Sequence, residues 1–217
     1  MDFKDCLEKR FSCRDFIPYE LSCEEIIKIV DLAKLSPSAV NMQPVKIAFL
    51  SGASLKNLSE KLLNAVKNDL PQSHDLIIYP KVWFEPYKSR RFETGVKLYE
   101  ILGITRDDKE KRLKQWHKNY GFFGAKNLAI FYIDDALSEG SVLDSGIFLA
   151  NFLNAATFYG FNTCVLGSVT SYSKDIKEIT NINGKILCAV AIGKASEDKV
   201  NSLRTTRINA SEIATFM

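Results

Sequence analysis

Two seven-residue segments of the chain are almost entirely hydrophobic, at 127–133 and 186–192. Such runs lack the alternation of a strand with one solvated face and are typical of strands that are covered on both faces. The short segment Lys46-Ile-Ala-Phe-Leu50, apolar after its first residue, also favours a strand. We therefore expect 127–133 and 186–192 to lie in the centre of a sheet.

Helical periodicity begins after Ser22, which is followed three positions later by Glu25 in the pattern of a capping box. Apolar residues then recur at helical spacing, which predicts a helix over about 23–35. A second helix is expected to open at Ser54, because apolar side chains follow on one face and charges on the other.

The segment 142–159 is the most hydrophobic helix candidate, and Gly160 behind it is suited to end a helix. Since the segment is apolar nearly all round, we expect it to be buried. A chain of this size offers limited cover for such a helix, so a subunit interface is a reasonable destination for part of it.

Residues 74–124 break the regular pattern, with two prolines and a charged helix candidate around 106–116. Ten of the 24 aromatic residues lie here, so this excursion is interpreted either as a lid or pocket wall for planar ligands or as a small satellite core. It also carries a basic cluster at Lys88, Arg90 and Arg91. The cluster suits acidic substrates, although we favour a simple role in solubility.

Strands mixed with helices place the chain in the α+β or α/β class. No repeat, low-complexity tract or linker divides it, so residues 1–217 are expected to form a single domain.

Composition narrows the function. A net charge of +3 is too balanced for nucleic-acid binding, and no stretch approaches the roughly 18 apolar residues of a membrane span. The N-terminus has no signal-peptide pattern, and the five cysteines form no CxxC pair and are odd in number, so we expect a cytoplasmic protein with reduced thiols.

The segment Arg10-Phe-Ser-Cys-Arg14 carries the first candidate chemistry. In an extended chain alternate side chains share a face, so Arg10, Ser12 and Arg14 would present two guanidinium groups and a hydroxyl, which suit a phosphate. Phe11 and Cys13 would then face the core. Taken alone, the pattern is more typical of solvated surface charge than of a phosphate site.

Two further segments are candidates for ligand binding. The segment Ser36-Pro-Ser-Ala-Val-Asn-Met-Gln-Pro44 offers small residues that let backbone amides approach a flat ligand, with Asn41 and Gln43 able to read a heterocycle edge. The same residues are ordinary helix-stop and turn residues. Near the C-terminus, Arg204 and Arg207 either add to an anion site or solvate a tail.

Other chemistries find no support. The glycines form neither GxGxxG nor a Walker A loop, and G-x-S-x-G and HExxH are absent. His74 and His117 stand apart from any cysteine cluster, so no metal site is expected.

In their order and spacing, R-x-S-x-R near the start, S-P-S-x-x-N-x-Q-P after the first long helix and two closing arginines resemble the nitroreductase family of FMN enzymes. The likeness covers essentially the whole chain, through Glu85-Pro-Tyr with Arg90-Arg91, Leu98 to Ile104, Phe122 to Ala125, Asp144 with Gly146, and Arg204-Thr-Thr-Arg207. Val45, where a tryptophan often follows Gln-Pro, and Gly193-Lys-Ala, in place of Gly-Tyr-Pro, depart from the family pattern.

The resemblance implies an α+β, three-layer fold in which helices flank a central mixed, mainly antiparallel sheet. It also implies an intertwined homodimer with FMN at the subunit interface. The phosphate and ribityl end would be held by the N-terminal segment and the closing arginines: Arg10, Phe11, Ser12, Cys13, Arg14, Arg204 and Arg207. The partner subunit would contribute Pro37, Ser38, Ala39 and Asn41, whereas Gln43 is taken as structural. A backbone N–H near Leu166 or Gly167 would face flavin N5.

The implied activity is reduction of a small planar acceptor, such as a nitroaromatic or quinone, by NADH or NADPH. Hydride would pass through flavin N5 in a ping-pong relay, and no catalytic side chain is expected because the flavin carries the chemistry. The excursion at 74–124 is expected to cover the active site. Dehalogenation, dehydrogenation or flavin cleavage on the same scaffold, or a non-catalytic flavin-binding module, stay open as alternatives.

Overall fold

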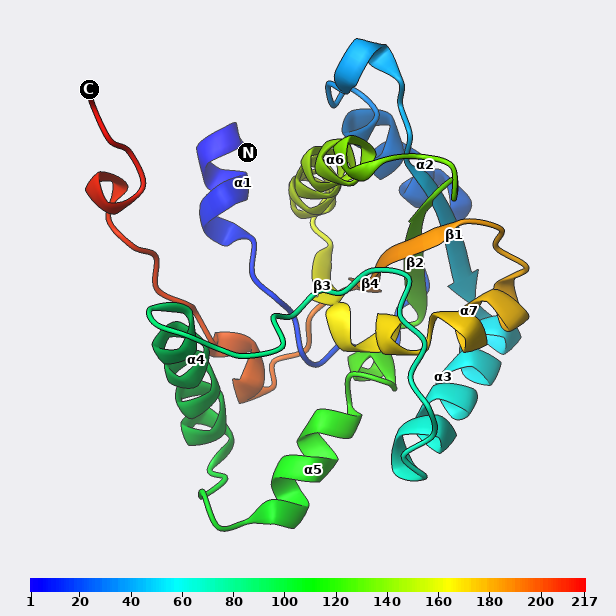
Figure 1. The fold of residues 1–217 in the computed structure, drawn as a ribbon. Helices are drawn as coiled ribbons and strands as arrows, with labels where there is room; N and C mark the ends of the chain where they lie inside the picture. The colour runs from blue at the N-terminus through cyan, green and yellow to red at the C-terminus, as the bar shows by residue number, and fades with distance from the viewer.

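A four-stranded antiparallel sheet in the order β1-β2-β4-β3 forms the centre of the protein, in a computed structural model that describes residues 1–217 (Figure 1). The strands are β1 (Lys46–Ser51), β2 (Asn127–Ile133), β3 (Asn162–Leu166) and β4 (Lys185–Gly193). The two continuous hydrophobic runs are β2 and β4, and both are central, as the sequence predicts. All strand pairs in the sheet are antiparallel, and the isolated bridge between Ser12 and Thr163 adds a parallel contact at the β3 edge.

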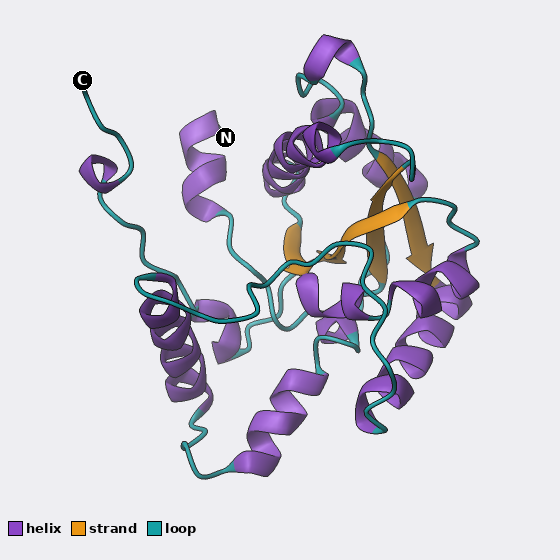
Figure 2. Cartoon of the chain, viewed as in Figure 1, coloured by secondary structure: helices purple, strands orange, loops and turns teal.

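The structure has seven α-helices. They are α1 (Phe3–Lys9), α2 (Cys23–Ala33), α3 (Gly52–Lys67), α4 (Tyr87–Leu102), α5 (Lys109–His117), α6 (Glu139–Phe158) and α7 (Ser173–Thr180). Of these, α4 and α5 stand away from the sheet (Figure 1 and Figure 2). Short 3-10 helices are η1 (Ala39–Asn41), η2 (Phe122–Gly124), η3 (Gly167–Ser171), η4 (Lys199–Ser202) and η5 (Ala210–Glu212). No helix is both long enough and apolar enough to cross a membrane.

The two faces of the sheet bury two separate hydrophobic clusters. On β2, Leu128 and Ile130 pack into one cluster together with leucines of α3, whereas Ala129 and Phe131 pack into the other with α2 and α6. This division follows from the alternation of side chains along a strand. It produces three layers and confirms the expected α+β architecture.

Helix boundaries agree closely with the sequence pattern. The Ser22 hydroxyl accepts from the Glu25 backbone N–H at 3.2 Å, and the Glu25 carboxylate accepts from Ser22 N–H at 2.8 Å, so the capping box of α2 is formed. Gly160 follows Tyr159, the C-cap of α6, and adopts φ +80°, as expected of a helix-ending glycine. The helix expected from Ser54 begins two residues earlier, at Gly52.

Three elements lie outside the sequence prediction: β3, α4 and α7. The β3 sequence is short and begins with two polar residues, so its hydrophobic pattern is weak. No residue of α4 is buried, so the pattern that marks an amphipathic helix is faint there. Both elements depend on long-range contacts, β3 on β4 and α4 on η4.

Candidate functional site

The segment that carries Arg10, Ser12 and Arg14 is extended and fixed against the sheet edge. Cys13 N–H donates to the Thr163 carbonyl at 2.9 Å, which aligns the segment beside β3. Arg14 N–H donates to Asn201 Oδ1 at 2.8 Å. The extended conformation predicted for this segment is therefore confirmed.

Asn201 ties the N-terminal segment to the C-terminal one. Its side-chain amide accepts from Arg14 N–H and donates from Nδ2 to the Asp15 carbonyl at 2.7 Å, and the side chain is 8% exposed. Because Asn201 lies in η4, the residues that follow it are brought beside Arg10 to Arg14. Asn201 was not predicted as a site residue, since a lone Asn carries no sequence signal of such a role.

Four arginines, which we call the arginine cluster, lie on these two segments: Arg10, Arg14, Arg204 and Arg207. Burial of the Arg10 guanidinium, and then the nearby positive charge of Arg207, lower the pKa of Arg10 from its usual value. The Arg204 guanidinium lies 4.1 Å from the centre of the Phe11 ring. Arg14 Nη1 donates to the Ser12 carbonyl at 3.0 Å.

No acidic side chain neutralises this arginine cluster. Each of the eight ion pairs in the structure involves a lysine, and none involves an arginine. The half-buried Arg10 and the exposed Arg207 repel each other and neither forms an ion pair, so together they favour a bound anion. A phosphate suits them, because its oxygens accept charge-assisted hydrogen bonds from guanidinium donors.

Phe11 and Cys13 contribute differently from the arginines. Cys13 is fully buried, its thiol donates to the Asp15 carbonyl at 3.2 Å, and burial raises its pKa to about 12. Its side chain therefore faces the core, as does the partly buried Phe11, which packs on the same core cluster. Any contact of Cys13 with a ligand is limited to its backbone.

The second group of expected site residues lies in the loop between α2 and β1. Ala39 N–H donates to the Asp144 carboxylate of α6 at 3.1 Å, and Gln43 N–H donates to the Ser38 hydroxyl at 2.9 Å. Gln43 Nε2 also donates to Asn41 Oδ1 at 3.1 Å, which agrees with a structural role for Gln43. These bonds hold the loop in an unusual backbone conformation, with positive φ at Val40, Asn41 and Gln43.

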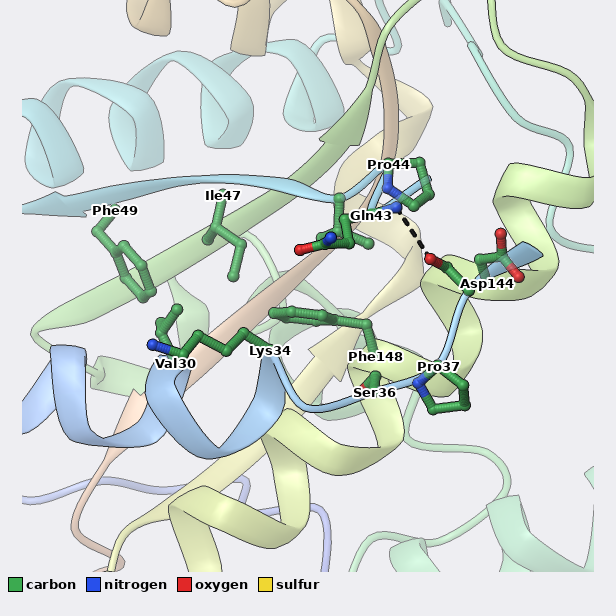
Figure 3. A pocket seen from close by; sticks show the side chains of 12 residues that line it. Val30, Lys34, Ser36, Pro37, Gln43, Pro44, Ile47, Phe49, Asp144 and Phe148 are labelled. Carbon is green, nitrogen blue, oxygen red and sulfur yellow. Dashed lines mark hydrogen bonds between the residues drawn. The ribbon is translucent and has the colours of Figure 1, made fainter. Parts of the chain in front are cut away.

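This loop borders a cavity of about 300 Å³ between α2, β1 and α6 (Figure 3). Ile47, Phe49 and Phe148 form apolar walls, and Lys34 and Asp144 add charge at its margins. Pro37 and Ser38 line the cavity, but none of the four arginines does. In Figure 1, α6 lies between this loop and the N- and C-terminal segments. Within a single chain, the loop with Pro37 and Ser38 and the arginine cluster therefore lie apart, although the family resemblance assigns both to one site.

The turn from β3 into η3 carries the third group. Leu166 is buried and Gly167 lies beneath the excursion: a Cβ atom at Gly167 would lie 3.2 Å from the Tyr79 hydroxyl. The side-chain hydroxyl of Ser168 is buried and has no hydrogen-bond partner. The contact between Tyr79 and Gly167 shows that the segment 74–86 crosses over this turn, as its path in Figure 1 also shows.

Comparison with known proteins gives one consistent result. A model described as "Nitroreductase family" matches residues 7–194. A 4-nitrobenzoate reductase of Pseudomonas putida is 33% identical over 100% of this chain and 96% of its own length. Nitroreductase NfnB of Mycolicibacterium smegmatis is 27% identical over 97% of this chain and 90% of its own length.

Solved structures agree with the sequence relatives. The FMN-dependent nitroreductase NfnB from Mycobacterium smegmatis in complex with NADPH superimposes with a TM-score of 0.92 at 25% identity, covering 99% of this chain and 97% of that one. The FMN and NADPH-dependent nitroreductase NfnB from Sphigopyxis sp. strain HMH superimposes with a TM-score of 0.96 at 24% identity over 100% and 99% of the two chains. The second likeness concerns the fold alone.

Proposed function

Because this chain belongs to the nitroreductase family, we propose that it is an FMN-dependent oxidoreductase that uses NADH or NADPH to reduce nitroaromatic or quinone-like acceptors. The observation that carries the proposal is the cluster of Arg10, Arg14, Arg204 and Arg207, which has no acidic partner and suits the phosphate of FMN. FMN, when bound, supplies two-electron chemistry by taking a hydride from the nicotinamide and passing its electrons to the acceptor.

The protein's part is to bind and orient. Arg10, Ser12, Arg14 and Arg207, with Arg204, would hold the phosphate and ribityl end, and a backbone N–H near Leu166 or Gly167 would serve the flavin ring. Donor and acceptor use the same cleft in turn, which explains why the chain needs no dinucleotide-binding motif. Reduction of a nitro group to nitroso takes up two electrons and two protons and releases water.

We place the complete site at the interface of a homodimer. Pro37, Ser38, Ala39 and Asn41 of one subunit would then meet the arginine cluster of the other, which resolves their separation within one chain. The excursion at 74–124 covers this site in a single-domain subunit. A cytoplasmic location is part of the proposal, supported by four buried cysteines that are unpaired.

An apolar stripe on α6 supports the dimer. Leu143, Gly146, Ile147 and Ala150 follow one another at helical spacing and are all exposed, Leu143 to 71%. Farther along the same helix, the side-chain oxygen of Asn154 is buried and has no hydrogen-bond partner. A second subunit on this face would cover the stripe.

Leu143→Arg is therefore expected to raise the dimer dissociation constant about tenfold or more, because it buries an unpaired charge in an apolar contact. FMN binding should fall with it. Sedimentation velocity over a range of concentrations measures the dimer, with Asn57→Arg on the exposed face of α3 as the matched control. A Leu143→Arg protein that dimerises like the wild type would contradict this interface.

The activity itself is tested by spectroscopy. The purified protein should be yellow or become yellow with FMN, and NADH or NADPH added without oxygen should bleach it. A nitroaromatic should then restore the colour. A colourless protein that ignores FMN would reject the flavin assignment, whereas a yellow protein that neither nicotinamide bleaches would point to a flavin-binding module.

A further inference from the structure

Three side chains of the excursion lead outward from the β3–η3 turn to a positive charge. The Tyr79 hydroxyl lies over Gly167. The rings of Tyr79 and Trp83 have their centres 6.0 Å apart. The guanidinium carbon of Arg91 lies 4.8 Å from the centre of the Trp83 ring. Aromatic surface at the proposed flavin turn is thus continuous with one guanidinium group.

Arg91 is held by this ring and not by an acid. No ion pair involves Arg91, and the Glu85 carboxylate, six residues earlier in the chain, accepts a hydrogen bond from the Ser89 hydroxyl at 2.6 Å. A guanidinium that packs on an aromatic ring keeps N–H donors free at its edge. These donors match a carboxylate in a bidentate arrangement.

We propose that Arg91 determines acceptor specificity by binding the carboxylate of an aromatic acid, such as a nitrobenzoate, while the acceptor ring lies along Tyr79 and Trp83. The inference rests on the proposed function and names the acceptor class of that same site. It replaces the sequence-based interpretation of this basic cluster as a solubility feature.

The neighbouring arginine provides a contrast. Arg90 lies 5.7 Å from the centre of the Tyr87 ring, and Tyr87 pairs with Phe84 at 5.1 Å. The rings of Phe84 and Tyr87 form no aromatic ring pair with Tyr79 or Trp83. Arg90 has the same charge as Arg91 and is likewise exposed. Substituting each in turn therefore distinguishes a specific role of Arg91 from an effect of the overall positive charge of α4.

The test compares steady-state kinetics with 4-nitrobenzoate and with uncharged nitrobenzene in the wild type, Arg91→Gln, Arg91→Lys and Arg90→Gln. Arg91→Gln should raise KM for 4-nitrobenzoate about five- to tenfold and leave kcat and the KM for nitrobenzene within about twofold. Arg91→Lys should recover part of this loss because it keeps the charge, and Arg90→Gln should match the wild type. Added salt should raise KM for 4-nitrobenzoate in the wild type but much less in Arg91→Gln.

The outcomes separate this inference from the proposed function. If the wild type reduces both nitroaromatics and Arg91→Gln changes neither KM, the carboxylate assignment is wrong while the activity stands. If Arg91→Gln raises KM for NADPH but not for NADH or 4-nitrobenzoate, Arg91 binds a nucleotide phosphate and the proposal is overturned. If Arg90→Gln has the same effect as Arg91→Gln, the preference for 4-nitrobenzoate comes from the overall positive charge of α4, and the specific role of Arg91 is rejected. A wild type that reduces no nitroaromatic would instead reject the proposed function.

Discussion

Replacing Arg10 with alanine is expected to weaken FMN binding by about ten- to a hundredfold, the effect of losing a charge-assisted contact of roughly 1.5–3 kcal/mol. Arg10 is half-buried, and its lowered pKa reflects burial and the repulsion of Arg207. In our proposal a phosphate relieves that repulsion by accepting from both guanidinium groups. Titration of the apoprotein with FMN, followed by flavin fluorescence or calorimetry, measures the change.

The same variant distinguishes a binding role from a structural one. Removing Arg10 also removes its repulsion with Arg207, so thermal stability of the apoprotein should stay level or rise slightly while FMN affinity falls. Arg106→Ala, which removes an exposed arginine from the loop before α5, is the control and should leave both unchanged. Unaltered FMN affinity in Arg10→Ala would remove this residue from the phosphate site.

Phe152→Ala is expected to lower the free energy of unfolding by about 3–5 kcal/mol, because it leaves a cavity in a closely packed interface. Phe152 is fully buried, and its ring centre lies 5.2 Å from that of Phe131 on β2 and 6.3 Å from that of Phe49 on β1. It therefore anchors α6 to the sheet. Urea unfolding followed by circular dichroism measures the loss.

Phe92→Ala is the matched control, because it makes the same chemical change on α4, where the side chain is 66% exposed. Its free energy of unfolding should change by no more than about 0.5 kcal/mol. A cost below about 1 kcal/mol for Phe152→Ala would show that α6 is not anchored at this point. Both proteins should be compared with FMN removed, so that ligand binding does not add to the apparent stability.

Local physics explains why much of the fold could be predicted. The runs at 127–133 and 186–192 are hydrophobic on both faces, and a strand of that kind is stable only when it is covered on both sides. The capping box at Ser22 and the helix-ending Gly160 act within a single turn of chain, so residue type alone indicates them. By contrast, β3 and α4 carry weak patterns and depend on partners distant in sequence, namely β4 and η4.

Part of the candidate site could likewise be predicted from the sequence, and part depends on tertiary contacts. Alternate arginines on an extended segment were visible in the residues from Arg10 to Arg14, and the structure confirms that conformation. Only the tertiary structure brings Arg207 beside Arg10, through the hydrogen bonds of Asn201 to Arg14 and Asp15. It also shows that these arginines have no acidic partner, which separates an anion site from ordinary surface charge.

The sequence by itself determined the class of fold, the central strands and the family. The first two depend on local hydrophobic patterning, and the family depends on motifs whose order and spacing can be recognised in the chain without any tertiary contact. The tertiary structure decided where the motifs lie: the arginine cluster at one place, the loop of Ser38 and Asn41 beyond α6 at another, and Tyr79, Trp83 and Arg91 in a row that leads away from Gly167. These placements are sums of many long-range contacts, none of which leaves a periodic signal in the chain, so no reading of residue order alone could supply them.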